Sequence, residues 1–393
     1  MLTDQHISII KSTIPLLEQA GSALTTYFYQ RMFKESPELQ NIFNMSNQSN
    51  GRQQVALFEA IAAYAKNIEN LAALTTAVER IAQKHTSFAI QAEHYAIVGH
   101  NLIETLRELA PDAFTPEVEE AWTAAYQFLA QIFIDREAQL YQQTKAAAGG
   151  WNGCRDFVVS SKKTESAFVK SFVFTPVDGE GVIGYLPGQY IGLDVLPVDS
   201  EFREIRQYSL SNKANGSDYR ISVKRENHPV SGVVSNYLHD HLQEGDVVQL
   251  HPPAGDFHFV DRGHNVALIS AGVGVTPMQA MLEQLSADDY AHKIHYLHAC
   301  ENAAAHSFAL RTQSLCDQPN REQHSWYLNG ENTNENGHSG YIDLNCAGIA
   351  LQETDFYLCG PVVFMQFMKQ QLLGLDVAQE CIHYEVFGPH QGL

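Results

Sequence analysis

Glycine is distributed so unevenly along this 393-residue chain that its first third and its remainder are expected to fold differently. Only Gly21, Gly51 and Gly99 of the 26 glycines precede Gly149. Glycine supplies the positive-φ positions that tight turns between strands need, so a segment almost without it favours helices. We therefore expect an all-helical first third followed by sheet-containing parts, within a chain long enough for roughly two or three domains.

The first third shows the periodicity of amphipathic helices. Apolar residues recur at helical spacing in three stretches, residues 24–32, 55–61 and 74–85. Breakers at residues 36–37, 46–51 and 111 separate about six predicted helices. Helices without a sheet must pack against one another around a common core. The Ala-Ala-Ala-Gly-Gly segment at 146–150 is the expected hinge to the next domain.

Beyond this hinge the pattern changes twice. Short β-rich runs bounded by turn residues come first, at residues 167–177, 189–195, 206–210, 219–224 and 246–250. They predict an antiparallel barrel. From about residue 264 strands alternate with helices: strands at 266–270, 293–297 and 356–358, and a helix at 277–285. This alternation predicts a parallel sheet.

Composition excludes several classes of protein. Lys and Arg number 25 against 45 Asp and Glu, and the net charge of −20 would repel nucleic acid and anionic lipid. No apolar run approaches the ~18 residues of a membrane span, so we expect a cytoplasmic protein. We also expect a monomer. The six cysteines form no Cys-x-x-Cys pair, so neither a zinc site nor a disulfide framework is expected.

The segment Ser-Ala-Gly-Val-Gly-Val-Thr-Pro at 270–277 lies between a predicted strand and a predicted helix. Its glycines let the backbone approach a pyrophosphate at a helix N-terminus, with Thr276 as cap and Pro277 at the first helical position. Any tight strand-to-helix turn can use two glycines, however, and the third glycine of the dinucleotide fingerprint is absent. The candidate cofactor contacts are Ala271, Gly272, Val273, Gly274, Val275 and Thr276.

A second motif, Arg206-Gln207-Tyr208-Ser209, falls on a predicted strand. Strand alternation places Arg206 and Tyr208 on one face, where a guanidinium for phosphate beside an aromatic ring suits a flavin. If this motif stood alone, an exposed Arg-x-Tyr ladder would be the favoured interpretation. Three further motifs flank it: Pro187-Gly188-Gln189-Tyr190, Gly232-Val233-Val234-Ser235 and Cys359-Gly360-Pro361.

In this order the motifs resemble the ferredoxin reductase type of flavin and nicotinamide module, over residues 152–393. The segment 384–389 is similar to that family's closing segment, in which an aromatic residue lies over the flavin, and Val386 stands where relatives often have cysteine. The resemblance implies flavin contacts at Tyr190, Arg206, Gln207, Tyr208, Ser209, Gly232, Val234, Ser235, Val386, Phe387, Gly388 and Pro389.

The helical third carries residues whose order adds to this picture. His85 near a helix end is either an ordinary histidine or a metal ligand, and Glu137 could belong to a solvated helix end. Gln53 and Leu57 lie four apart, hence on one helical face. With Tyr29, Phe43, Gln53, Leu57, His85, Tyr95 and Glu137 in this order ahead of the reductase module, the whole chain resembles a flavohemoglobin.

That resemblance implies three domains: an all-α globin with haem b at 1–145, an antiparallel β-barrel with FAD at 151–261, and an α/β parallel-sheet domain for NADH or NADPH at 262–393. It makes His85 the proximal iron ligand, with Glu137 and Tyr95 at its other ring nitrogen. It makes Tyr29, with Gln53 beside it, the distal donor of a hydrogen bond to iron-bound oxygen. It also implies that Phe43 and Leu57 line the pocket and that Lys84 and Glu385 influence the redox centres.

The activity that the resemblance implies is nitric oxide dioxygenation, in which NO and O₂ become nitrate at the expense of NAD(P)H, a detoxification. Two other functions stay open: an oxygen store or redox sensor, and a general flavin reductase with a regulatory globin. The Tyr95 and Glu137 match argues against both, because neither needs an electron-rich proximal ligand. The choice between NADH and NADPH stays open.

Overall fold

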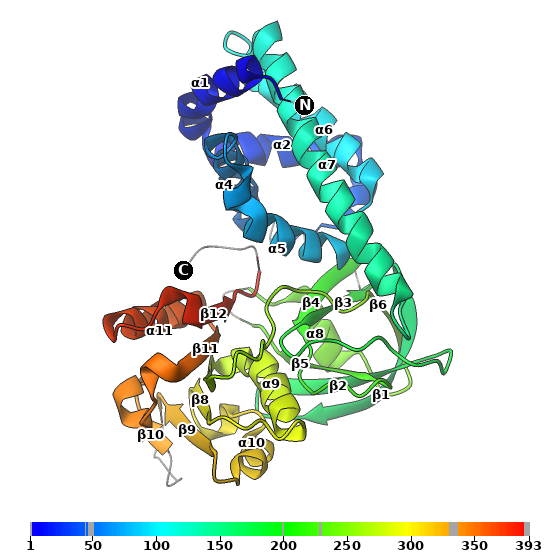
Figure 1. Ribbon diagram of the computed structural model, residues 1–393. Coiled ribbons are helices and arrows are strands. Elements are labelled where there is room, and N and C mark those ends of the chain that lie inside the picture. The colour runs from blue at the N-terminus through cyan, green and yellow to red at the C-terminus, as the bar shows by residue number, and fades with distance from the viewer. Residues whose placement is uncertain are drawn as a thin grey trace. The chain divides into compact units, whose positions relative to one another are not determined.

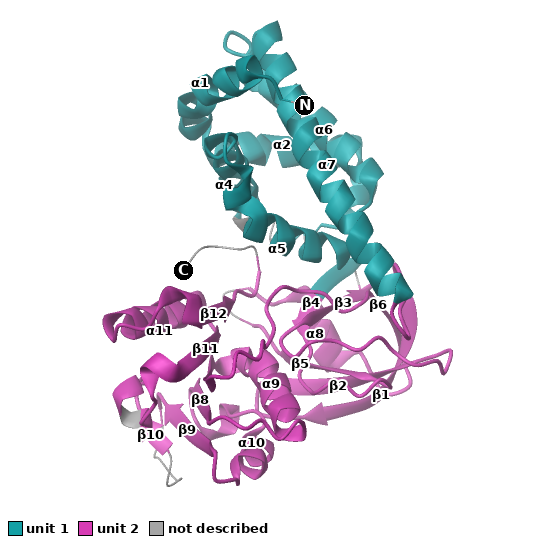
Figure 2. Cartoon of the chain, in the orientation of Figure 1, with its two compact units in different colours: residues 1–146, 199–206 teal, residues 147–198, 207–393 magenta. Residues whose placement is uncertain are grey.

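A computed structural model describes residues 2–43, 45, 51–198, 200–227, 230–329 and 337–388. The chain divides into two compact units (Figure 2). The first comprises Met1–Ala146 with Asp199–Arg206, and the second Ala147–Val198 with Gln207–Leu393. Each unit is described by itself below.

The first unit is built from helices, as the glycine distribution predicts (Figure 1). They are α1 (Asp4–Ala20), α2 (Ser22–Glu35), α4 (Arg52–Lys66), α5 (Thr75–Thr86), α6 (Ala92–Leu109) and α7 (Pro116–Ala146), with 3₁₀ turns η1 (Pro37–Asn41) and η2 (Leu71–Leu74). Gly21 has a φ of +55° and divides α1 from α2, and Gly51 has a φ of +76° and begins α4. Gly99 lets α6 approach the ring of Tyr126, which a Cβ at this position would overlap. Each early glycine thus serves a helix boundary or a helix contact.

Helix α7 organises the core of this unit by packing along α1, α5 and α6 (Figure 1). The main cluster includes Ile10, Phe28, Met32 and Trp122, all at most 5% exposed. A smaller cluster of Ala82, Phe133 and Leu140, between α5 and α7, is extended by partly buried neighbours such as Tyr95. Burial of these side chains, at ~1.5–3 kcal/mol for a large one, holds the helices together.

An antiparallel sheet follows α7 in the chain and belongs to the second unit, apart from Glu204–Arg206 of its strand β4, which fall in the first. Its strands are β1 (Arg155–Thr164), β2 (Val169–Pro176), β3 (Tyr190–Val195), β4 (Glu204–Ser209), β5 (Tyr219–Lys224) and β6 (Val247–Leu250), in the order β4-β3-β6-β1-β2-β5. Helix α8 (Val233–Asp240) follows β5. The expected barrel is therefore observed as a six-stranded sheet with β4 and β5 at its ends, and Leu210, which follows β4, forms an isolated bridge to Ile221 of β5.

The parallel sheet predicted for the C-terminal part is confirmed. Its strands are β7 (Asn265–Ala271), β8 (Ile294–Cys300), β9 (Arg321–Tyr327), β10 (Gly337–Ser339), β11 (Thr354–Cys359) and β12 (Ile382–Glu385), in the order β10-β9-β8-β7-β11-β12. The helices are α9 (Val275–Ala287), α10 (Ala309–Cys316) and α11 (Val362–Gly374), and the 3₁₀ turns η3 (Gly272–Gly274), η4 (Ala303–Ala305), η5 (Leu344–Ala347), η6 (Leu351–Glu353) and η7 (Gln379–Cys381). The chain reverses its direction of travel across the sheet between β7 and β11, and in such sheets ligands bind at this switch point.

Two further properties of the described residues bear on function. The helices there are all too short or too polar to cross a membrane. The five cysteines whose side chains are described, Cys154, Cys300, Cys316, Cys359 and Cys381, are free thiols.

Candidate functional site

Three helices of the first unit bring His85, Tyr95 and Glu137 together. Nδ1 of His85, in the last turn of α5, lies 2.8 Å from Oε1 of Glu137 on α7 and 2.9 Å from the Tyr95 hydroxyl on α6. Tyr95 donates to the same Glu137 oxygen at 2.5 Å. Burial, and then the charge of Glu137, raise the pKa of Tyr95, so its hydroxyl remains a donor.

This arrangement fits a haem iron. A carboxylate accepts hydrogen bonds, so the proton of His85 lies on Nδ1 and the lone pair of Nε2 is left to bind a metal. Glu137 is only 2% exposed and lies well inside α7, which excludes its placement at a solvated helix end. Its neighbour Arg136 instead pairs with Glu79 at 2.6 Å.

Aromatic side chains surround Tyr29, which is 5% exposed on α2. Its ring stacks on Phe33 and meets Phe43 edge-on, both at 5.9 Å between centroids. Phe43 and Leu57 pack against the same buried cluster, and Gln53 lies half-buried one helical turn before Leu57. The structure thus places Tyr29 with Phe43 and Leu57 in one apolar region.

The Arg-Gln-Tyr-Ser motif lies on β4, which begins at Glu204, two residues before the predicted start of this strand. Nη1 of Arg206 bonds Oε2 of Glu204 at 2.7 Å and the Ile205 carbonyl at 2.9 Å. A guanidinium is planar and permanently charged, which suits Arg206 to the recognition of phosphate. Tyr208 and Gln207 are half-buried and Ser209 is buried, and Tyr208 packs against the core of the sheet.

Two further segments supply backbone groups to this proposed flavin region. Tyr190 begins β3 and exchanges hydrogen bonds of 3.0 and 2.9 Å with Ala254. Gly232 caps α8, Val234 is 2% exposed, and Ser235 lies in the first turn. A helix N-terminus presents N–H groups that lack intrahelical partners, which suits a pyrophosphate.

The glycine loop meets the end of β11 at the switch point of the parallel sheet. A Cβ on Gly274 would overlap the Cys359 carbonyl and lie 2.6 Å from Gly360 N, so only glycine allows this approach. Ala271 ends β7, Gly272, Val273 and Gly274 form η3, and Val275 and Thr276 begin α9. These adjoining elements hold all the predicted nicotinamide contacts.

The predicted cap at Thr276 is wrong. The 3₁₀ turn η3 continues directly into α9, whose N-cap is Gly274 in a helical conformation. Thr276 is already inside the helix and donates its hydroxyl to the Val273 carbonyl at 3.0 Å. The extended residue before this helical segment is Ala271, and a side-chain cap at Thr276 would need an extended backbone there. Pro277, predicted at the first helical position, is the third residue of α9.

The C-terminal residues predicted to touch the flavin differ in exposure. Val386 is 7% exposed within the core of the parallel sheet, whereas Phe387 is 44% exposed. Gly388 has a φ of +122°, which favours glycine. Pro389 lies outside the described residues.

Three family models match successive parts of the chain. The globin family model matches residues 26–133, the oxidoreductase FAD-binding domain model residues 156–259, and the oxidoreductase NAD-binding domain model residues 268–370. A flavohemoprotein of Vibrio cholerae is 59% identical over 397 residues, which cover the whole of both chains. This chain belongs to the flavohemoglobin family.

Solved structures support the family fold. The flavohemoglobin of Malassezia yamatoensis, with bound FAD and haem, matches 98% of this chain and 100% of its own at a TM-score of 0.89 and 26% identity. The FAD/NAD-binding domain of nitric oxide dioxygenase from Vibrio cholerae matches 60% of this chain and 99% of its own at a TM-score of 0.57 and 49% identity. The cytochrome b5 reductase domain of Ulva prolifera nitrate reductase shares the fold of 59% of this chain, covering 97% of that domain, at a TM-score of 0.53 and 20% identity.

Sequence reasoning missed two residues at these sites. Phe133 on α7 packs against the rings of His85 and Tyr95, at 5.7 and 6.3 Å between centroids. Glu204 bonds Arg206. Strand alternation, which puts residues two apart on one face, could have indicated Glu204. Phe133 carried no comparable signal.

Two predicted site residues, Lys84 and Glu385, remain to be placed. Lys84 precedes His85 on α5, and its carbonyl accepts a hydrogen bond from Ser87 at 2.8 Å. Glu385 ends β12.

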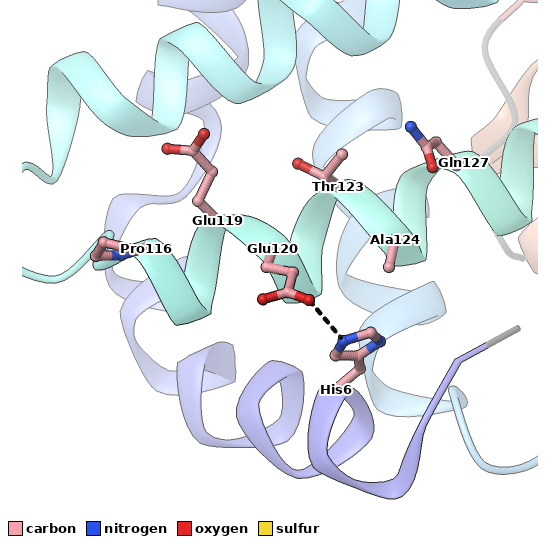
Figure 3. Close-up of a pocket in the computed structure, with 7 residues that line it drawn as sticks. All are labelled: His6, Pro116, Glu119, Glu120, Thr123, Ala124 and Gln127. Atoms are coloured by element: carbon pink, nitrogen blue, oxygen red, sulfur yellow. Dashed lines mark ion pairs between the residues drawn. The ribbon is translucent and has the colours of Figure 1, made fainter.

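A shallow pocket on α1 and α7 is lined by His6, Pro116, Glu119, Glu120, Thr123, Ala124 and Gln127 (Figure 3). None of these seven is a predicted site residue, so this pocket is separate from the candidate site.

Proposed function

We propose that this chain is an NAD(P)H-dependent nitric oxide dioxygenase that uses haem b and FAD to convert NO and O₂ to nitrate. The buried contact between Glu137 and His85 carries this proposal. The relative from Vibrio cholerae that shares 49% identity with the reductase part is itself described as a nitric oxide dioxygenase. We propose the boundaries 1–145, 151–261 and 262–393 for the domains, and a cytoplasmic monomer.

His85 holds the iron through Nε2, while Glu137 accepts the Nδ1 proton. This hydrogen bond makes the imidazole more basic and therefore a stronger electron donor to the metal. Tyr95 donates to Glu137 and keeps the carboxylate oriented. When bound, haem supplies the site for O₂ and NO, and FAD converts a two-electron hydride into single electrons.

Tyr29 would supply a hydrogen-bond donor to the ligand of the haem. The rings of Phe33 and Phe43 beside it, together with Leu57, exclude water, so that one hydroxyl has a large electrostatic effect. Gln53, on the same helix as Leu57, is the second polar group of this pocket.

Residues that follow α7 in the chain bind the two nucleotides. Arg206 would hold the FAD phosphates through charge-assisted hydrogen bonds, and the N-terminus of α8 would receive the pyrophosphate. Tyr208 and Phe387 would supply the aromatic contacts to the flavin ring. Gly272 and Gly274 let the backbone approach NAD(P)H at the end of β7.

Nitrate yield tests the proposal. Each NO takes one electron on its way to nitrate, so each NAD(P)H oxidised with NO and O₂ should yield two nitrates. The matched variant His85→Ala should lose haem and nitrate formation yet keep FAD and the reduction of artificial acceptors. No nitrate from the unaltered protein would overturn the proposal and favour an oxygen store, a redox sensor or a general flavin reductase.

A further inference from the structure

Three side chains of metal-ligating type converge on one face of the antiparallel sheet. Cys154 immediately precedes β1, Asp194 lies on β3, and His251 follows β6, the strand between the other two. Arg155 pairs with Leu250, so Cys154 comes opposite His251. Asp194 pairs with Gln249, two residues before His251 and therefore on the same face. The strand register itself brings the three together.

The ligand atoms lie close to one another. Sγ of Cys154 is 3.4 Å from Nε2 of His251 and 3.7 Å from Oδ2 of Asp194. Every pair among the three ligand atoms is within 4.8 Å. Asp194 and His251 are 7% and 2% exposed, whereas Cys154 is exposed. A buried acid and imidazole thus face a thiol that solvent and ions can reach.

We propose that Cys154, Asp194 and His251 bind one zinc-class divalent cation, with water as its fourth ligand. Zinc bonds of ~2.3 Å to sulfur and ~2.0–2.1 Å to nitrogen or oxygen, at a tetrahedral angle, place such ligand atoms roughly 3.5 Å apart. The observed 3.4 and 3.7 Å lie on either side of that separation. A thiolate and an imidazole beside one carboxylate suit zinc and disfavour the all-oxygen ions Mg²⁺ and Ca²⁺.

The proposed cation site shares strand β3 with Tyr190, one of the proposed flavin contacts. Asp194 is four residues after Tyr190 on β3, and His251 is three residues before Ala254. Tyr190 and Ala254 are the residues that exchange two backbone hydrogen bonds. A cation on Asp194, His251 and Cys154 ties β3, β6 and β1 together, and a cation bound only by the folded state stabilises that state.

Zinc K-edge absorption on the protein carrying haem and FAD tests the site, because the signal is specific to zinc and haem iron does not contribute. After metal depletion and dialysis against Zn²⁺, we expect about one zinc per chain with one sulfur at ~2.3 Å and lighter ligands at ~2.0–2.1 Å. Cys154→Ser should remove the sulfur signal and weaken zinc binding at least about tenfold, and Asp194→Asn should weaken binding with sulfur retained.

Cys316→Ser is the matched control, because burial raises the pKa of this thiol to about 12 and keeps it protonated. It should leave zinc content and the sulfur signal unchanged. Substoichiometric zinc, zinc without sulfur, or an unaltered sulfur signal in Cys154→Ser would each overturn the proposal. Alkylation of Cys154 at the same rate with and without Zn²⁺ would also overturn it, leaving a thiol that is only hydrogen-bonded to His251.

Discussion

Glu137 holds Oε1 of its carboxylate 2.8 Å from Nδ1 of His85, although 52 positions separate the two residues in the chain. Tyr95 donates to the same oxygen, and Phe133 packs against both the imidazole and the phenol. A buried carboxylate in this place orients the ring and leaves Nε2 as the ligand atom.

Glu137→Gln should keep haem but lower NO turnover by roughly tenfold to a hundredfold, because a neutral amide is a weaker acceptor for the Nδ1 proton. NADH-dependent NO consumption measures the loss, and the iron–histidine stretching frequency should fall with it. Glu79→Gln is the control, since Glu79 pairs with Arg136 between the same two helices without contacting His85. Equal turnover in the two variants would refute the role of Glu137.

Tyr29→Phe should speed O₂ release about a hundredfold to a thousandfold, which is the usual cost of losing one aligned donor in a dry pocket. The ring and its contacts with Phe33 and Phe43 remain. Stopped-flow measurement of O₂ dissociation tests this. Tyr64→Phe removes a buried hydroxyl that donates to the Ala125 carbonyl and should leave O₂ release unchanged. Wild-type O₂ release from Tyr29→Phe would mean that another residue is the distal donor.

Arg206→Ala should weaken FAD binding roughly tenfold to a hundredfold, because each charge-assisted bond to phosphate contributes ~1.5–3 kcal/mol. Haem content should not change. Arg155→Ala removes an arginine of the same sheet that pairs with Asp178 and should leave the flavin dissociation constant unaltered. The hypothesis fails if titration with FAD gives the same constant for Arg206→Ala and the parent.

Gly274→Ala should disrupt the nicotinamide site, because the added Cβ would force the glycine loop away from Cys359 and Gly360. We expect the KM for NAD(P)H to rise at least about tenfold, since such loops position the pyrophosphate through their backbone. Gly374→Ala, at a helix position with open space and no positive φ, is the control and should change neither KM nor stability by much. An unchanged KM for Gly274→Ala would remove the loop from the nicotinamide site.

Burial lowers the pKa of His306 to about 4, and its Nδ1 lies 3.0 Å from the Tyr327 hydroxyl. The unfolded chain has a histidine pKa near ~6.5 and binds more protons below that value, so the stabilising effect of the neutral ring is complete above ~6.5. It is lost as the pH falls toward about 4, by up to about 3 kcal/mol. Thermal unfolding of His306→Gln between these pH values should have a shallower pH dependence than the parent. Equal slopes would contradict this origin.

Local patterns determined the class and order of the domains. Periods of 3.6 and 2 in hydrophobicity reflect which face of a helix or strand is buried, and the early scarcity of glycine left the first third little besides helix. The motif at Arg206 and the loop at Gly274 could be predicted from short segments. Strand alternation determines which residues share a face, and glycine alone lets the backbone approach another group closely. The resemblance to flavohemoglobins then named His85, Tyr95 and Glu137 as neighbours.

Only the tertiary structure decided which side chains meet. Sequence indicated neither that Glu204 bonds Arg206 nor that η3 runs into α9 and displaces the expected cap at Thr276. It gave no sign of Cys154, Asp194 and His251 as a group, because the partners lie 40 and 97 positions from the cysteine. Their proximity arises from the register of β1, β6 and β3, which depends on how whole strands pair and pack, and no short segment carries that information.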